Sequence, residues 1–143
     1  MASVGGFAGA VNPKPIAEGL SGAIGAALDE VNNQLYFVDY NTGELNRLGL
    51  TPTCLDLDTV TKCTIHSVAS GFSHPENVVL DVGAGIAYVT TRDPPGSGGL
   101  YRVDLGTGSK TLVTFNLGDR NFIFRSIERT THTEPESSTR FAV

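Results

Sequence analysis

One stretch of this sequence occurs twice. Residues 17–40 align without a gap with residues 69–92, 52 positions further along the chain (69 − 17 = 52). The identical pairs are Ala17/Ala69, Gly19/Gly71, Ser21/Ser73, Leu28/Leu80, Asp29/Asp81 and Tyr36/Tyr88. At several other positions one apolar residue replaces another, as in Leu20/Phe72 and Phe37/Val89. The chain is therefore expected to build the same supersecondary unit twice.

Each unit has the composition of short strands joined by tight turns. Gln34 to Tyr40 alternates aromatic and branched residues and predicts a strand, and residues 41–43 (Asn-Thr-Gly) predict the turn after it. The strands expected in the first unit are residues 14–18, 26–28, 34–40, 44–48 and 64–69; those of the second are 77–80, 86–91, 100–105 and 110–115. A repeat of about 40–50 residues made of four strands is typical of a β-propeller blade. We expect an all-β fold of four-stranded antiparallel blades that form an incomplete propeller in one chain.

The same pattern suggests how the chain is divided. Residues 1–13 are small and flexible and predict an arm, whereas residues 14–127 carry the repeat pattern. Within them we place blade one at about 14–69, blade two at about 70–116 and part of a third blade at 117–127. Residues 128–143 are polar and predict an exposed tail.

Composition excludes some classes of protein. Hydrophobic residues make up 40% of the chain and charged residues 17%, with 17 Gly and 7 Pro, which suits a β-rich protein with many turns. The formal charge of −5 argues against nucleic-acid binding, which requires a basic surface to neutralise phosphates. The apolar part of the N-terminus is short, so we expect no membrane span there and no strong secretory signal.

Residues 49–62 form an irregular excursion that the second unit lacks. Cys54 lies within it and Cys63 directly after it. A zinc site takes four ligands, and His66 is the only histidine near these thiols. We favour a local disulfide over two free thiols, which leans the localisation towards an extracellular or periplasmic compartment.

Two blades do not make a propeller, which closes with about four to eight. Residues 14–18 would be an orphan outer strand and residues 121–124 an orphan inner strand, and the flat faces of both terminal blades would be uncovered. Repeats of this kind need neighbours to bury their cores. We therefore expect either a homo-oligomer, as a ring or a fibre of copies, or a piece of a larger propeller.

Residues 28–48 resemble the blades of six-bladed propellers with YWTD or NHL repeats, and those of the gluconolactonase/strictosidine-synthase-like group. The features that carry the resemblance are Asp29 at the end of the first strand, the Tyr36-Phe37 pair, Asp39 and Gly43. The second unit is similar in SHPENVVLD and GGLYRVDL but departs from the pattern at Thr91, where the family Asp is missing. The resemblance covers about residues 15–124. It implies the architecture more specifically than the function, since these families include receptors, scaffolds and enzymes.

In lactonase-like relatives a metal is held at the inner ends of first strands. The resemblance would place Glu76 and Asn77 there, with His74 near them, and oxygen ligands suit Ca²⁺. The matching positions in the first unit, Ile24 and Gly25, have no side chain that binds a metal. The ordinary interpretation of these polar residues is turn capping.

A ligand-contacting rim is the second candidate site. Arg92 and Asp93 begin the Pro/Gly loop of the second unit, and His74 would lie nearby. The alternative is a simple salt pair between the two. Asp29 and Asp81 are interpreted as turn formers, because each lies where a strand leads into a hairpin.

No set of residues with catalytic spacing is found, so no catalytic residue is nominated. We expect a non-enzymatic propeller module that acts as a self-assembling scaffold or binding surface. The alternative is a fragment or subunit of a lactonase-like, metal-dependent hydrolase that uses Glu76 and Asn77 as ligands.

Overall fold

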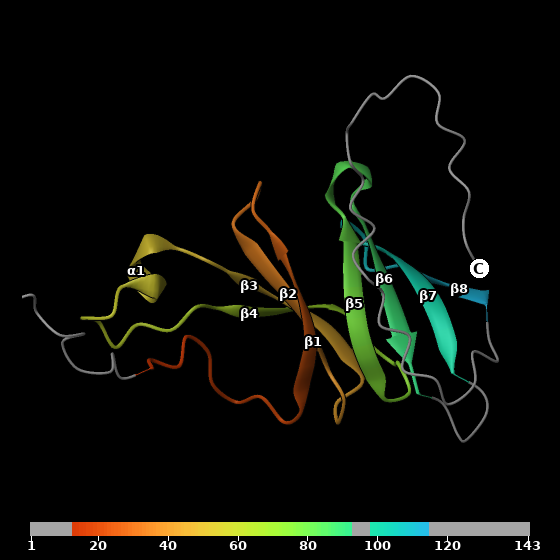
Figure 1. Ribbon diagram of the computed structural model, residues 1–143, viewed down its shortest axis with the longest axis horizontal. Helices are drawn as coiled ribbons and strands as arrows, with labels where there is room; N and C mark the ends of the chain where they lie inside the picture. Colours follow the sequence, from red (N-terminus) through yellow and green to blue (C-terminus); the bar gives the residue numbers. More distant parts are fainter. Residues whose placement is uncertain (1–12, 93–97, 115–143) are drawn as a thin grey trace, which may run out of the picture.

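The computed structural model describes residues 13–92 and 98–114. The predicted arm up to residue 12, Asp93, the partial third blade and the polar tail lie outside these residues. The fold is all-β, as predicted, and consists of two four-stranded antiparallel sheets that do not close into a barrel (Figure 1).

The strands of each sheet follow one another in chain order, as in the blade of a propeller. The first sheet has the order β1-β2-β3-β4, with β1 at Ala23–Asp29, β2 at Gln34–Asp39, β3 at Glu44–Gly49 and β4 at Ile65–Ala69. The second has the order β5-β6-β7-β8, with β5 at Pro75–Asp81, β6 at Ile86–Thr91, β7 at Gly99–Asp104 and β8 at Lys110–Thr114. Two short helices complete the described elements: α1 (Pro52–Leu55) and the 3₁₀ helix η1 (Val82–Ala84).

The repeat in the sequence is a repeat in the structure. β5 and β6 begin 52 residues after β1 and β2 (75 − 23 and 86 − 34). Both inner strands begin earlier than predicted, because a β-bulge interrupts each of them near its start. The Asp29 carboxylate accepts the Asn32 N–H at 3.0 Å, and that of Asp81 accepts the Ala84 N–H at 3.2 Å. The interpretation of these two aspartates as turn formers is therefore confirmed.

The predicted strand at residues 14–18 is wrong. This segment has a bend at Ile16 and joins no sheet. A backbone bond from the Cys63 N–H to the Ile16 carbonyl, at 2.7 Å, connects it to the excursion. Pro15 lacks an N–H and Lys14 turns its ammonium group to carbonyls, so the segment lies across the excursion instead of extending a ladder.

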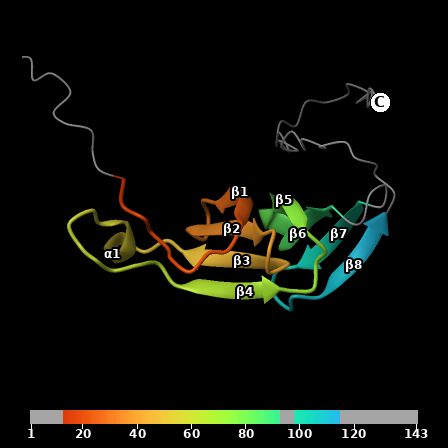
Figure 2. The ribbon, with the colours of Figure 1, turned by 90° about the horizontal axis from the view of Figure 1, so that it is seen from below.

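The main core lies between the two sheets. It is formed by Tyr36, Val38, Leu45, Ala69, Phe72, Val78, Ala87, Val89 and Val103. The inner strands β1 and β5 lie side by side at the centre of the molecule, and β4 and β8 lie at the opposite margin (Figures 1 and 2). The two sheets therefore stack face against face, as neighbouring blades do.

A second, smaller core covers the other face of the first sheet. Phe37 and Leu48 of the sheet are buried together with Cys54 and Cys63 of the excursion, and Ile16 packs against them. We expected both terminal faces to be uncovered. The first sheet differs because its own excursion folds back over Phe37 and Leu48.

Within residues 13–92 and 98–114 the structure contains no helix with the length and hydropathy that crossing a membrane requires.

Candidate functional site

The predicted ligand and metal residues gather where β5 begins and β6 ends. The Arg92 N–H donates to the His74 carbonyl at 2.9 Å, which closes this end of the second sheet. The Arg92 guanidinium Nε lies 3.6 Å from Glu76 Oε1. His74, Glu76 and Arg92 therefore come together, with Arg92 paired to Glu76, whereas Asp93 lies outside the described residues.

His74 connects this end of the second sheet to the first. Its ring centroid lies 4.7 Å from that of Tyr40, which follows β2. The His74 backbone has φ = +46°, in the left-handed region that few residues other than Gly adopt, although Asn, Asp and His do so more often than the rest. The residue turns the chain into β5 and places its ring against the neighbouring sheet.

The two predicted metal ligands both have protein partners. The Glu76 carboxylate faces Arg92, and the Asn77 side-chain oxygen accepts the Val78 N–H at 2.9 Å. Within the described part of the chain no three His, Cys, Asp or Glu side chains are grouped so that they could share a metal ion. A calcium ion at this place would compete with Arg92 for Glu76 and with a backbone N–H for Asn77.

At the end of the first sheet where β1 begins and β2 ends, the Asp39 carboxylate accepts several hydrogen bonds. This carboxylate is 3% exposed and accepts four backbone N–H groups, from Ser21, Gly22, Asn41 and Thr42, at 3.0–3.1 Å. Burial raises the pKa of this carboxyl, but the four donors stabilise the anion and hold the pKa below its ordinary value. Asp39 thus fastens the chain before β1 to the turn after β2.

In the second sheet, Thr91 takes the place of this aspartate. Its hydroxyl oxygen accepts the Gly99 N–H at 3.2 Å and is buried. Where the first sheet has an anion, the second sheet therefore has a neutral hydroxyl that is bonded to the adjacent strand β7.

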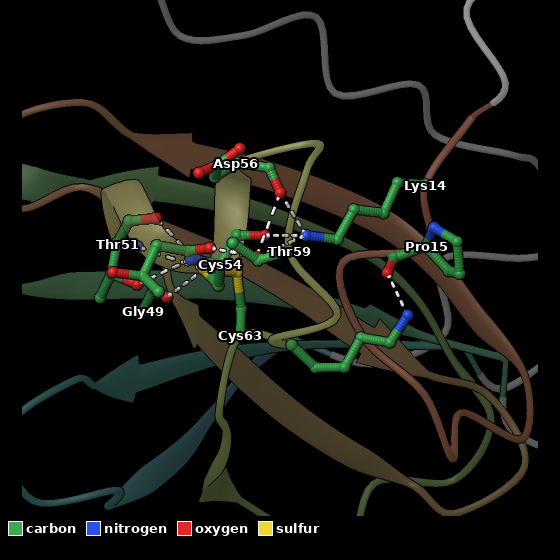
Figure 3. Close-up of a disulfide and its surroundings, with 10 residues drawn as sticks. Lys14, Pro15, Gly49, Thr51, Cys54, Asp56, Thr59 and Cys63 are labelled. Atoms are coloured by element: carbon green, nitrogen blue, oxygen red, sulfur yellow. Dashed lines mark hydrogen bonds between the residues drawn. A yellow bond between two sulfur atoms is a disulfide. The ribbon is translucent and has the colours of Figure 1, made fainter.

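The disulfide between Cys54 and Cys63 is confirmed (Figure 3). Thr51 caps α1, because its hydroxyl accepts the Cys54 N–H at 3.3 Å. Lys14 donates to the Asp56 carbonyl and to the Thr59 hydroxyl, and Lys62 donates to the Pro15 carbonyl at 2.8 Å. The N-terminal segment and the disulfide loop are therefore fastened to each other at several points.

Lys110, at the start of β8, forms a clamp that the sequence did not predict. Its ammonium group donates to the Ser70 and Gly71 carbonyls, each at 2.6 Å, and lies 4.6 Å from the centre of the Phe72 ring. Phe72 in turn meets Tyr101 edge to face, with ring centroids 5.5 Å apart. A lone Lys after a GTGS turn gives no signal of this contact, because its partners lie about 40 residues earlier in the chain.

No protein-family model matches this chain, and no curated protein matches it significantly.

Proposed function

We propose that this chain is a non-enzymatic binding module of propeller-type blades, which assembles by packing a copy of itself against one of its sheets. The observation that carries the proposal is the contact between its own two sheets. They bury one shared apolar core through equivalent strands, and a contact between two repeated units is one that further units can repeat.

Assembly through sheet faces fits the structure better than exchange of a strand. A ring in which each copy lends residues 14–18 to the blade of its neighbour would need a strand there, and this segment instead lies on the disulfide loop. The face of the second sheet that points away from the first carries the directly paired residues Tyr88 and Arg102. We place the contact between copies on this face.

The polar side chains where β5 begins and where β2 ends are already bonded to other groups of the protein. Glu76 pairs with Arg92, Asn77 bonds its neighbouring N–H, and Asp39 is saturated by four N–H donors. These contacts organise turns and strand ends, which supports a binding role over a hydrolytic one.

Light scattering during size-exclusion chromatography tests the proposal. The full chain is measured over a wide range of concentrations, and we expect a dimer that dissociates on dilution. A folded monomer at every concentration would contradict the proposed function.

Charge reversal locates the contact. Arg102→Glu places a carboxylate beside Asp104 on the proposed face and is expected to shift the chain towards monomer. Glu30→Lys, a charge reversal in the exposed β1–β2 turn, serves as the matched control and should leave the association constant unchanged.

A further inference from the structure

The first sheet has an addition that the second lacks. Residues 50–64 connect β3 to β4, whereas residues 105–109 suffice to connect β7 to β8. A blade of this type can therefore be completed without the excursion. The extra residues cover the face of the first sheet that points away from the second sheet.

The covered face is apolar and extends beyond its cover. Phe37 and Leu48 lie beneath the excursion, and Leu28, paired directly with Leu35 and therefore on the same face, is 51% exposed. The opposite face of the same sheet carries Tyr36 and Val38 and packs on the second sheet. The first sheet thus has two faces suited to sheet stacking, one used within the chain and one closed by the excursion.

Cross-links hold the excursion in place in addition to its apolar packing on Phe37 and Leu48. Its only helix, α1, has four residues, too few to be stable by itself. The bonds that hold it include the disulfide and the contacts of Lys14 and Lys62 (Figure 3). Backbone bonds from the Cys63 N–H to the Ile16 carbonyl and from the Leu50 N–H to the Asn33 carbonyl add to them. Of these, the disulfide is the covalent one.

We infer that the disulfide loop is an end cap, which limits assembly to one face while Cys54 and Cys63 are joined and opens a second docking face when they are reduced. This inference rests on the proposed function. The occupant of the opened face is the outer face of the second sheet of another copy. By the repeat this face, with Tyr88, corresponds to the Tyr36 face of the first sheet, and the opened Phe37 face corresponds to the Val89 face on which Tyr36 already packs. In the oxidised chain the outer faces of two second sheets meet, and assembly stops at a dimer. In the reduced chain this outer face docks instead on the opened face of the next copy, so the dimer contact is replaced and the chain continues head to tail.

Opening requires a dithiol as reductant. One thiolate of the dithiol attacks a cysteine sulfur and forms a mixed disulfide, while the other cysteine leaves as a thiolate. The second thiol of the reductant then closes its own disulfide and releases the first cysteine, so two electrons pass to the protein. Cys54 and Cys63 are only 1% and 5% exposed, so reduction follows movement of the loop.

The full chain, oxidised and reduced with dithiothreitol, is compared by light scattering. We expect a dimer in the oxidised sample and species larger than a dimer in the reduced sample. A reduced sample that keeps the mass of the oxidised one would overturn the inference and leave the proposed function standing, and so would an oxidised sample that already forms rings or fibres. Monomers in both samples would overturn both proposals. An oxidised monomer with a reduced dimer would contradict both the dimer of the proposed function and the growth beyond a dimer inferred here.

Variants separate docking from non-specific aggregation. Leu28→Glu adds a charge to the opened face and should stop growth of the reduced chain at the dimer, while the oxidised dimer is unchanged. Val31→Glu is the control, because Val31 is 80% exposed in the adjacent turn, and it should grow as the wild type does. Equal growth of both reduced variants would overturn the inference.

A double variant removes the need for reductant. Cys54→Ser with Cys63→Ser should assemble beyond the dimer without dithiothreitol, and circular dichroism checks that it is folded. If this variant is unfolded, the reduced wild type and its Leu28→Glu form still decide the question.

Discussion

At the scale of single residues, Asp39 links two segments that are far apart in the chain. Its two carboxylate oxygens divide four backbone N–H groups between them, two before β1 and two after β2. These donors would otherwise have to find water at a crowded strand end. An anion is the best acceptor for such a set, since each oxygen can accept two hydrogen bonds.

Replacing this anion gives the first prediction. Asp39→Asn keeps one oxygen acceptor but turns an NH₂ group towards two N–H donors, and should lower the free energy of unfolding by about 1–3 kcal/mol. Because the folded pKa of Asp39 is depressed, the stability it contributes is present above the unfolded pKa and is lost as the pH falls through the folded pKa. Urea denaturation should therefore show the full difference between variant and wild type at neutral pH, and this difference should shrink progressively as the pH falls below about 4.

The control for this prediction is Asp58→Asn. Asp58 is exposed on the disulfide loop, and its replacement should change stability little at any pH. A difference between Asp39→Asn and wild type that persisted undiminished in acid would contradict the assigned role of the charge.

Gly25 gives the second prediction. It has φ = +51°, and a Cβ atom there would lie 2.5 Å from the Glu76 carbonyl oxygen and 2.7 Å from the Asn77 Cα. Gly25→Ala should therefore destabilise the protein by more than about 1 kcal/mol, since backbone strain and a clash with β5 add together. Thermal unfolding of Gly49→Ala is the matched comparison, because a Cβ atom at Gly49 meets nothing within 4 Å. Equal melting temperatures of Gly25→Ala and Gly49→Ala would show that β1 and β5 are not packed so closely.

At the scale of elements, the order of strands within a sheet depends on short turns, whereas the packing of sheet on sheet depends on the segment between them. Residues 70–74 carry the chain from β4 to β5. Phe72 enters the main core from this segment, and Lys110 of β8 covers it from outside. The last strand of the second sheet is thus fastened to the connection that precedes its first strand.

The Lys110 clamp gives the third prediction. Lys110→Met keeps the aliphatic chain but loses two hydrogen bonds and the contact of the charge with the Phe72 ring, so it should cost about 1–2 kcal/mol of stability. Lys110→Arg keeps the charge and donors and should cost less. Chemical denaturation of the two variants measures the difference. If Met and Arg proved equally harmless, the clamp would be a surface contact without energetic weight.

At the scale of the whole molecule, neither sheet has a complete core of its own. Val38 and Leu45 of the first sheet and Val89 and Val103 of the second are fully buried in one cluster. Separating the sheets would expose both sides of it to water, which is costly for so many aliphatic groups.

The shared core gives the fourth prediction. The described sheets should unfold together, so calorimetry should find one transition with equal calorimetric and van't Hoff enthalpies. Val89→Ala is a change in the second sheet, but it should also lower the melting temperature of the first sheet. Hydrogen exchange of the β2 amides measures this effect. Two transitions, or β2 protection that does not respond, would show that the sheets are independent.

Much of the candidate site follows from local sequence, and some of it does not. The disulfide between Cys54 and Cys63 and the turns at Asp29 and Asp81 join residues close in the chain, so spacing was enough to predict them. The contact of His74 with Tyr40 and the clamp of Lys110 join residues more than 30 positions apart. Nothing in their local sequence indicates a partner at that distance. The strand predicted at residues 14–18 failed for a related reason, since alternation in so short a segment does not show whether a strand neighbour is available.

The sequence by itself determined the repeat and the kind of unit it builds, because strand and turn preferences are local and Ala17–Tyr40 and Ala69–Arg92 share them. It also favoured the disulfide, because Cys54 and Cys63 lie only nine positions apart. Only the tertiary structure decided what lies on the two faces of the first sheet. Alternation along β2 shows that Tyr36 and Phe37 point to opposite sides, but it cannot show that Tyr36 meets the second sheet and Phe37 the disulfide loop. That choice depends on the path of the excursion and of residues 14–18, which is fixed by contacts between distant segments.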